Sequence, residues 1–184
     1  MANAVLLLVD VQKGLLRGHP WQEEAFLQTL SKLLAAFRES QKEVVFVRHD
    51  DGPDSESLAL GSSGWEIAEE IAPQPGEKIF DKRKNSAFLG TGLEAYLKDR
   101  GADTLVIAGM QTEYCVDATI KSAFERGFRV ILPTGGVTTF DSAMLSAAGL
   151  NRLFYDHIWK GRFAEILLPE KILPSAELES EELR

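Results

Sequence analysis

The stretch Asp103-Thr-Leu-Val-Ile-Ala-Gly-Met-Gln-Thr-Glu-Tyr-Cys-Val-Asp-Ala-Thr-Ile-Lys-Ser-Ala-Phe124 decides the fold of this chain. Its apolar run from Leu105 to Ala108 contains β-branched residues and predicts a short buried strand. From Tyr114 onward, apolar residues recur at three- and four-residue spacing, which predicts a helix that ends near Gly127. The one cysteine of the chain, Cys115, therefore lies near the first turn of a helix that follows a core strand.

This position favours a reactive role for Cys115. In an open parallel sheet, ligands bind outside the carboxyl ends of the strands, which is where Cys115 follows its strand. The N-terminus of a helix carries unpaired N–H groups and a partial positive charge, which lower the pKa of a thiol and hold anions. We therefore interpret Cys115 as a nucleophile with a lowered pKa. The alternative is a free cysteine that packs as a small buried hydrophobic residue.

Composition limits the class of protein. A length of 184 residues with 45% hydrophobic content predicts a single domain over residues 1–184, with an acidic tail from residue 175 that frays. No apolar run approaches the roughly 20 residues that cross a bilayer, and the N-terminus does not resemble a signal peptide. A single cysteine excludes an intrachain disulfide, so we expect a cytoplasmic location. The formal net charge of -8 argues against nucleic-acid binding through a basic surface.

Predicted strands and helices alternate along the rest of the chain. Strands are predicted over residues 4–9, 43–48, 128–132 and 163–168, with another that starts at residue 78 and runs into a basic loop. Helices are predicted over residues 20–40, 65–71, 91–100 and 141–155, and loops over residues 12–20 and 49–64. This alternation is typical of an α/β protein in which helices cover both faces of a parallel sheet.

Three reactive groups follow predicted strands: Asp10, a lysine of the 82–84 loop, and Cys115. Right-handed crossovers bring such strand ends to one edge of the sheet. A thiolate there attacks a carbonyl carbon, a carboxylate takes the thiol proton and returns it to a leaving amine, and an ammonium pairs with the thiolate. The alternative for Asp10 is a cap of the following turn, and the alternative for each lysine is a solvated side chain.

Three segments resemble the motifs of the isochorismatase-like cysteine hydrolases, which include nicotinamidases, N-carbamoylsarcosine amidases and ureidoacrylate amidohydrolases. They are Val-Asp10-Val-Gln12, Lys82-Arg-Lys-Asn-Ser-Ala-Phe-Leu-Gly-Thr-Gly-Leu93 and Gly109-Met-Gln-Thr-Glu-Tyr-Cys-Val-Asp-Ala-Thr119. The resemblance covers nearly the whole chain. It implies a three-layer α/β/α fold of Rossmann-like topology around about six mostly parallel strands. It also implies hydrolysis of a C–N bond in a small amide, carbamoyl or ureido substrate through a thioester, without a cofactor.

By motif match, the resemblance implies a catalytic triad of Asp10 as general base and acid, Lys82 as the partner of the thiolate, and Cys115 as the nucleophile. Lys82 is preferred to Lys84 because the lysine of the family usually precedes the Ser-Ala-Phe element by four residues. A non-proline cis peptide of the family maps onto Met110–Gln111. The backbone N–H groups of Gln111 and Cys115 would then form an oxyanion hole.

The chain departs from nicotinamidases in the region after its second strand. Those enzymes bind a metal through an Asp-x-His motif and further histidines, whereas this chain reads Val47-Arg-His-Asp-Asp-Gly52. We therefore predict no metal. The alternative functions are isochorismatase-type hydrolysis of other small molecules, a non-catalytic small-molecule-binding role, and thiol redox chemistry. The last lacks a resolving cysteine within the chain.

Substrate contacts are predicted for Gln12, Leu15, Phe88 and Tyr114, with ordinary core packing as the alternative for the last three. The segment 144–159 carries more large apolar residues than one helix face buries, which fits either a subunit interface or the core. The resemblance implies a homodimer or a higher homo-oligomer. The expected partners are thus a small-molecule substrate and copies of the chain, without nucleic acid or membrane.

Overall fold

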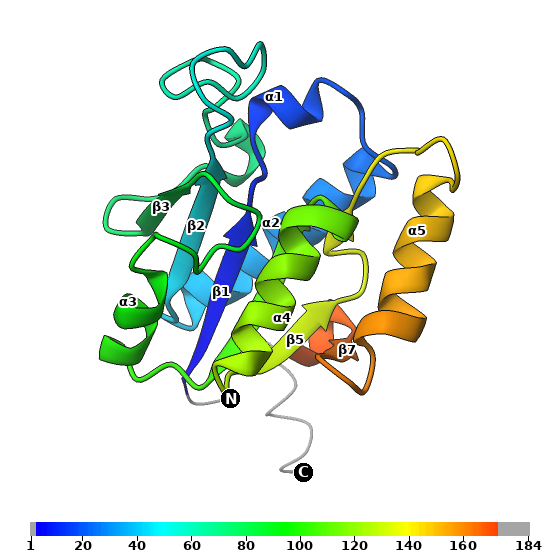
Figure 1. The fold of residues 1–184 in the computed structure, drawn as a ribbon. Coiled ribbons are helices and arrows are strands. Elements are labelled where there is room, and N and C mark those ends of the chain that lie inside the picture. Colours follow the sequence, from blue (N-terminus) through cyan, green and yellow to red (C-terminus); the bar gives the residue numbers. More distant parts are fainter. Residues whose placement is uncertain (1–2, 173–184) are drawn as a thin grey trace.

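The computed structural model describes residues 3–172, so the predicted acidic tail lies outside the described residues. Its sheet contains seven strands, six of them in the order β3-β2-β1-β4-β5-β7, while β6 pairs with β4 (Figure 1). All the strand pairs within residues 3–172 are parallel, which confirms the predicted α/β sheet. The strands are β1 (Ala4–Val9), β2 (Val44–His49), β3 (Lys78–Lys82), β4 (Thr104–Met110), β5 (Arg129–Pro133), β6 (Val137–Thr138) and β7 (Glu165–Leu167).

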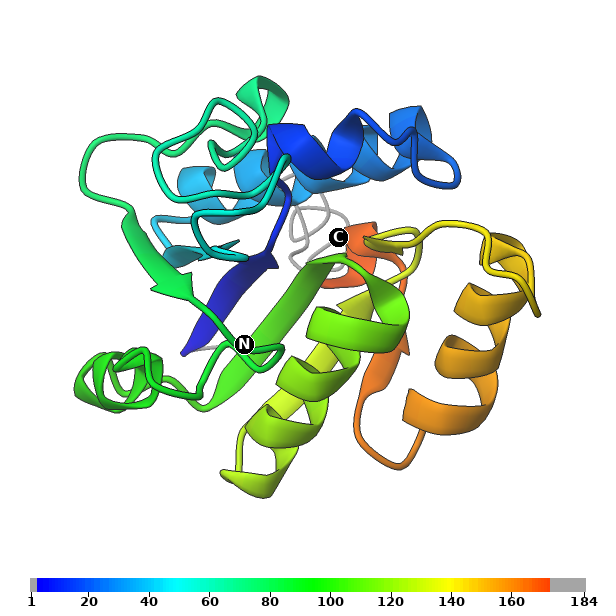
Figure 2. The same cartoon turned by 45° about the horizontal axis from the view of Figure 1, so that its top comes forward.

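Helices cover both faces of the sheet. In Figures 1 and 2, α3, α4 and α5 lie over one face, and α2 lies over the other. The α-helices are α1 (Lys13–Leu16), α2 (Glu23–Glu39), α3 (Leu93–Asp99), α4 (Asp117–Glu125), α5 (Ala147–Leu153) and α6 (Pro169–Ile172). Three short turns complete the list: the 3₁₀ turn η1 (Glu69–Ile71) and the π-helical turns η2 (Thr112–Val116) and η3 (Phe154–Trp159). The predicted three-layer α/β/α architecture is therefore confirmed.

The sheet separates two hydrophobic cores. All six residues of β1 are buried, and successive side chains of a strand point to opposite faces, so β1 contributes to both cores. Val5, Leu7 and Val9 pack with α3 and α4, whereas Leu6 and Leu8 pack with α2. This burial on both sides explains why the strand is a continuous apolar run rather than an alternating one.

The end of β1 lies against the end of β4. Val9 pairs with Gly109 in the parallel register. A Cβ atom on Gly109 would lie 2.0 Å from the carbonyl oxygen of Val9, and the residue has a φ of +139°. Only glycine fits this close approach. The residues that follow the two strands, Asp10 and the turn η2, are consequently neighbours.

Some predicted boundaries are wrong. The helix predicted over residues 141–155 begins only at Ala147, because Ser146 caps it and Asp141 accepts a hydrogen bond from the Ala147 N–H at 2.8 Å. The helix predicted over residues 65–71 is reduced to η1, and the predicted loop over residues 12–20 contains α1. Within residues 3–172, no helix is long and apolar enough to cross a membrane.

Candidate active site

Asp10 follows β1 directly and is almost fully buried, with 1% of its surface exposed. Its φ of +56° lies in the left-handed region, which aspartate and asparagine tolerate better than most residues. Its Oδ2 atom lies 2.6 Å from the Nζ atom of Lys82. Neither carboxylate oxygen accepts a well-aligned hydrogen bond from a described residue, so we treat this contact as an ion pair. The carboxylate therefore retains free lone pairs that can take up a proton.

Lys82 is the last residue of β3, and its side chain is completely buried. Besides Asp10, its ammonium contacts the Nδ1 atom of His49 at 2.8 Å and the Sγ atom of Cys115 at 3.2 Å. Lys84 is exposed. The structure thus brings Lys82, and not Lys84, to Asp10 and Cys115.

Cys115 lies in η2, immediately before α4, as the sequence predicted. The predicted cis peptide bond between Met110 and Gln111 precedes this turn and is confirmed. A hydrogen bond holds this turn to α5: the Thr112 hydroxyl donates to the Oδ1 atom of the buried Asn151 at 2.5 Å. The sulfur also lies 3.9 Å from the Oδ1 atom of Asn85, on the loop after β3.

Burial dominates the electrostatics of the site. It raises the pKa of the Asp10 carboxyl above its ordinary value, although Lys82 acts in the opposite direction. Burial, helped by the negative charge of Asp10, also raises the pKa of the Cys115 thiol to about 12. The predicted lowering of the thiol pKa by the helix terminus is therefore wrong. Cys115 rests as a neutral thiol and needs a base to become a nucleophile.

The donor atoms of Asp10, His49 and Cys115 all lie within 4.8 Å of one another, a mixed oxygen, nitrogen and sulfur set of the kind that binds zinc. The Lys82 ammonium contacts all three of these residues. A cation already joins the three donors, and a metal ion would have to displace it. The absence of a metal stays a prediction.

His49 is a site residue that the sequence motifs did not indicate. It ends β2 and pairs with Lys82 across the two strands. Its Nε2 atom lies 2.7 Å from the Oδ1 atom of Asp51, so the imidazole links the buried lysine to the loop after β2. The rule that chemistry gathers at the carboxyl ends of parallel strands could have pointed to this residue.

Gln12 is fully buried, and its side-chain amide forms hydrogen bonds with backbone groups. The Oε1 atom accepts a hydrogen bond from the His49 N–H at 2.8 Å, and Nε2 donates to the carbonyls of His49 at 3.0 Å and Trp65 at 2.9 Å. These three bonds give Gln12 a role in holding His49, and its substrate contact stays a prediction.

The other three predicted pocket residues differ in position. Leu15 is partly buried in α1 and packs against the core on the α2 side of the sheet. Phe88 stacks on Phe128 and lies under Arg126, at the far end of α4 from Cys115, so core packing accounts for it. Tyr114 precedes the cysteine and is 54% exposed, which leaves it available to a substrate.

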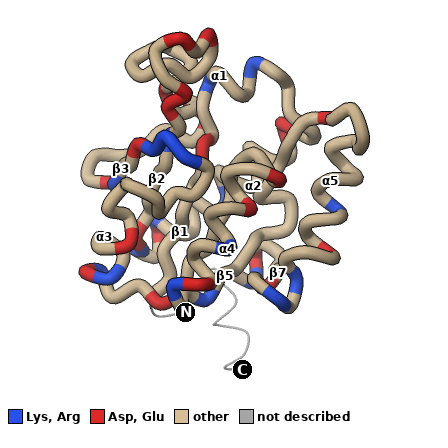
Figure 3. Tube along the Cα trace, viewed as in Figure 1, with Lys and Arg blue, Asp and Glu red and all other residues tan. Residues whose placement is uncertain are grey.

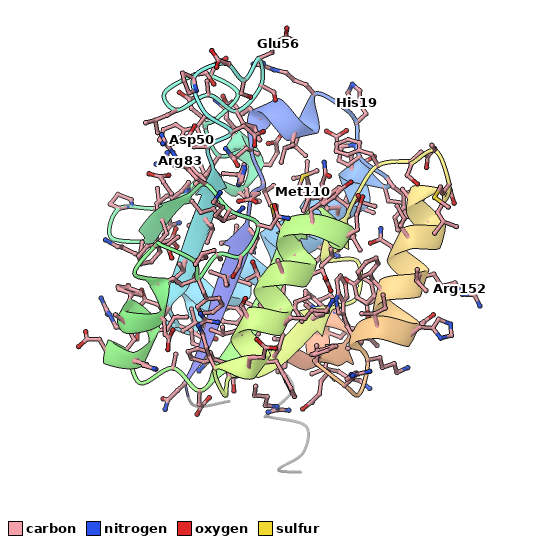
Figure 4. The ribbon with its side chains drawn as sticks, in the orientation of Figure 1. His19, Asp50, Glu56, Arg83, Met110 and Arg152 are labelled. Carbon is pink, nitrogen blue, oxygen red and sulfur yellow. The ribbon has the colours of Figure 1, made fainter. Side chains whose placement is uncertain are left out.

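The loop of residues 50–64 projects beside the site, above the basic stretch that follows β3 (Figures 1 and 3). Asp50 fixes the base of this loop. It accepts hydrogen bonds from the N–H groups of Gly52 and Leu60 at 2.8 and 3.3 Å, and it pairs with Arg83 at 2.7 Å (Figure 4). These bonds lower the pKa of Asp50.

This arrangement joins a thiol, a buried carboxylate that can accept its proton, and an ammonium within contact distance of both. Such a set can deprotonate the thiol at the moment of attack and stabilise the resulting thiolate. It is therefore suited to nucleophilic attack by sulfur on an electrophilic carbon.

Comparison with known proteins agrees with this geometry. A family model described as the isochorismatase domain matches residues 4–167. Streptothricin hydrolase of Streptomyces noursei is 36% identical over 138 residues, which cover 74% of this chain and 50% of that protein. The chain thus spans half the length of this curated relative. The isochorismatase family protein YwoC of Bacillus subtilis is 32% identical over 181 residues, which cover 91% of this chain and 94% of that protein.

Solved structures give the same result. A crystal structure of an isochorismatase family protein has a TM-score of 0.84 at 32% identity, with 91% of this chain and 99% of that chain covered. The N-carbamoylsarcosine amidase of Thermoplasma acidophilum has a TM-score of 0.75 at 25% identity, with 91% and 97% covered. From the family model, the relatives and the fold together, the chain belongs to the isochorismatase family of hydrolases.

Proposed function

We propose that this protein is a cysteine hydrolase that cleaves a C–N bond of a small amide, carbamoyl or ureido compound. The observation that carries the proposal is the buried Lys82 ammonium, which lies 2.6 Å from the Asp10 carboxylate and 3.2 Å from the Cys115 sulfur. Asp10 is the general base and acid, Lys82 stabilises the thiolate, and Cys115 is the nucleophile.

In the first half-reaction, the thiol proton moves to the Asp10 carboxylate while Sγ attacks the carbonyl carbon of the substrate. The C–N bond then breaks, and Asp10 returns the proton to the leaving nitrogen, which departs as an amine or ammonia. The product of this step is a thioester on Cys115. Because the thiol has a high pKa at rest, the transfer to Asp10 must accompany the attack.

In the second half-reaction, Asp10 takes a proton from water, and the oxygen of that water attacks the thioester carbon. The C–S bond breaks, the acid product leaves, and the proton on Asp10 returns to the sulfur. During both attacks, the negative charge on the carbonyl oxygen is stabilised by the backbone N–H groups of Gln111 and Cys115. The chain thereby ends each cycle as it began.

The names of two relatives support the choice of a C–N bond. N-carbamoylsarcosine amidase of Arthrobacter is 39% identical over 79 residues, and the Thermoplasma enzyme of the same name shares the fold. Both names describe an amidase that acts on a carbamoyl compound. We infer that this chain acts on a related class of small molecules.

We further propose that the chain forms a homodimer or a higher homo-oligomer. Core packing accounts for part of the segment 144–159, because Leu150 and Trp159 are buried. Met144, Leu145 and Leu153 remain exposed by 92%, 43% and 38%. These residues support an interface on the α5 side. A cytoplasmic location and the absence of nucleic-acid and membrane partners stay predictions from the composition.

A panel of small amides, carbamoyl compounds and ureas tests the proposed reaction. We expect the wild-type protein to release ammonia or an amine from at least one compound, and Cys115→Ala to release none. Retention of full turnover by Cys115→Ala on a compound that the wild type hydrolyses would remove the proposed nucleophile. A thermal unfolding curve for each variant shows whether it is folded.

A further inference from the structure

The backbone of His49 is fixed on both sides by one buried side chain. Gln12 accepts a hydrogen bond from the His49 N–H at 2.8 Å and donates one to the His49 carbonyl at 3.0 Å. Gln12 is 0% exposed, so water does not compete for these bonds. The position of the imidazole relative to Lys82 is therefore set by the fold.

The contacts of the imidazole decide which of its nitrogens carries the proton. A lysine ammonium only donates hydrogen bonds, so Nδ1 of His49, 2.8 Å from the Lys82 Nζ atom, must accept. A carboxylate only accepts, so Nε2, 2.7 Å from the Asp51 Oδ1 atom, must donate. These two contacts place the imidazole proton on Nε2, and Asp51 favours this tautomer.

The ammonium of Lys82 contacts three neighbours, one through an ion pair and two through hydrogen bonds. These neighbours are Asp10 Oδ2 at 2.6 Å, His49 Nδ1 at 2.8 Å and Cys115 Sγ at 3.2 Å. The side chain of Lys82 is 0% exposed, so an N–H group without a protein partner would lack a water partner as well. Without His49, one N–H group of the buried ammonium would lose its acceptor, and the orientation of the ammonium toward the sulfur would no longer be fixed on that side.

We propose that His49, held by Gln12 and Asp51, is a positioning residue that directs the Lys82 ammonium at Asp10 and Cys115. The inference rests on the proposed role of Lys82 in stabilising the thiolate. It also connects the site to the loop of residues 50–64, because Asp51 belongs to this loop and donates its N–H to the Leu58 carbonyl at 3.3 Å. A movement of the loop that shifts Asp51 would then shift the His49 imidazole and, with it, the Lys82 ammonium.

The test measures how fast iodoacetamide alkylates the protein at pH 8, with no substrate needed. Cys115 is the only cysteine of the chain, so the rate reports on its thiolate alone. The variants are chosen by atom position. Asn in place of His49 places its amide near the position of Nδ1, where its oxygen can accept from Lys82. Gln places its amide near the position of Nε2, beyond Nδ1, and Leu has no polar group. His19→Leu is the matched control, because His19 contacts Glu23 at 2.9 Å with an 84% exposed side chain outside the site.

We expect His49→Leu and His49→Gln to slow alkylation about tenfold, the effect of one lost hydrogen bond to a charged group. We expect His49→Asn to stay within about threefold of the wild type, because its amide oxygen still accepts from the lysine. His19→Leu should match the wild type. If His49→Leu fails to fold, the Asn and Gln pair gives the same comparison between two polar side chains.

Equal rates for the folded Asn and Gln variants, or a wild-type rate for His49→Leu, would overturn the proposal. Lys82→Met separates this result from the proposed function. If Lys82→Met slows alkylation while the His49 variants do not, only the role of His49 is wrong. If Lys82→Met leaves the rate unchanged, Lys82 does not stabilise the thiolate, and the proposed triad is wrong as well.

Discussion

The sulfur of Cys115 lies 3.2 Å from the ammonium of Lys82, and yet the pKa of its thiol is raised to about 12. Burial and the Asp10 carboxylate together outweigh the positive charge of the lysine. The resting site therefore contains a neutral thiol beside a base and not a thiolate. The ammonium stabilises the sulfur once the thiol proton has moved to Asp10.

This relationship predicts an unusual response to Asp10→Asn. The substitution removes the negative charge that raises the pKa of the thiol, so the thiolate fraction at pH 8 increases. Asparagine also tolerates the left-handed backbone at this position. We expect iodoacetamide to alkylate Cys115 faster in this variant than in the wild type, while hydrolysis of any substrate is lost with the base. A slower or unchanged rate of alkylation would contradict the account of the thiol.

For the wild type, the high pKa predicts that alkylation has no plateau near neutral pH. The rate should rise about tenfold for each pH unit between pH 7 and 10. Only the thiolate reacts, and at pH values below the pKa the thiolate fraction increases about tenfold with each pH unit. The measurement is a series of alkylation rates at constant ionic strength. A plateau below pH 8 would show that the free site holds a thiolate, as the position at a helix terminus first predicted.

Gln12→Ala tests whether Gln12 holds the backbone or binds substrate. The change leaves the His49 N–H and the carbonyls of His49 and Trp65 without partners, so we expect a loss of about 3 kcal/mol in the free energy of unfolding. Gln28→Ala is the control, since the side chain of Gln28 is exposed and donates a hydrogen bond to Glu24 on the helix surface, and it should cost less than about 0.5 kcal/mol. Unchanged stability together with weaker substrate binding would show that Gln12 contacts the substrate and does not hold the backbone.

Gly109→Ala tests the close approach of β1 and β4. The added Cβ atom would lie 2.0 Å from the Val9 carbonyl oxygen, next to Asp10, and we expect a cost of about 3 kcal/mol in stability with loss of activity. Gly127→Ala is the control: this glycine also has a positive φ, but an added Cβ atom would meet no atom of another described part of the chain within 4 Å, so only about 1 kcal/mol should be lost. The free energy of unfolding of both variants is measured by urea denaturation. Similar losses for the two would mean that the contact between β1 and β4 is not what destabilises Gly109→Ala.

Arg83→Met tests the anchor of the loop of residues 50–64. Its guanidinium pairs with the buried Asp50 at 2.7 Å, so its removal should expose the loop and speed its cleavage in limited proteolysis. Lys84→Met removes an exposed charge from the adjacent position and should leave the rate of cleavage unchanged. Equal rates for the two variants would show that the ion pair does not hold the loop.

The strands of the core were predictable because they are buried on both faces. Such strands appear as unbroken apolar runs, and β1, β2 and β4 lie where these runs placed them. The start of α5 was not predictable in this way. It depends on Ser146 and on the carboxylate of Asp141, either of which can cap a helix, and the sequence does not say which one does.

The site was predictable at the level of strand ends and motifs, and less so at the level of bonds. Asp10, Lys82 and Cys115 meet because parallel strands share an edge. His49 was missed because its partner Lys82 is 33 residues away, and only the register of β2 and β3 sets them side by side. The pKa of Cys115 was predicted in the wrong direction because its burial depends on packing that the sequence does not display.

Intact-protein mass spectrometry tests the central claim most directly. Wild type and Cys115→Ala would be incubated with the panel of amides, carbamoyl compounds and ureas and quenched in acid, and the mass of each intact protein would then be measured. We predict an adduct of the acyl mass on the wild type alone, which would show a thioester on the only cysteine of the chain. Turnover with no such adduct on the wild type under any quench time, or an equal adduct on Cys115→Ala, would contradict the account.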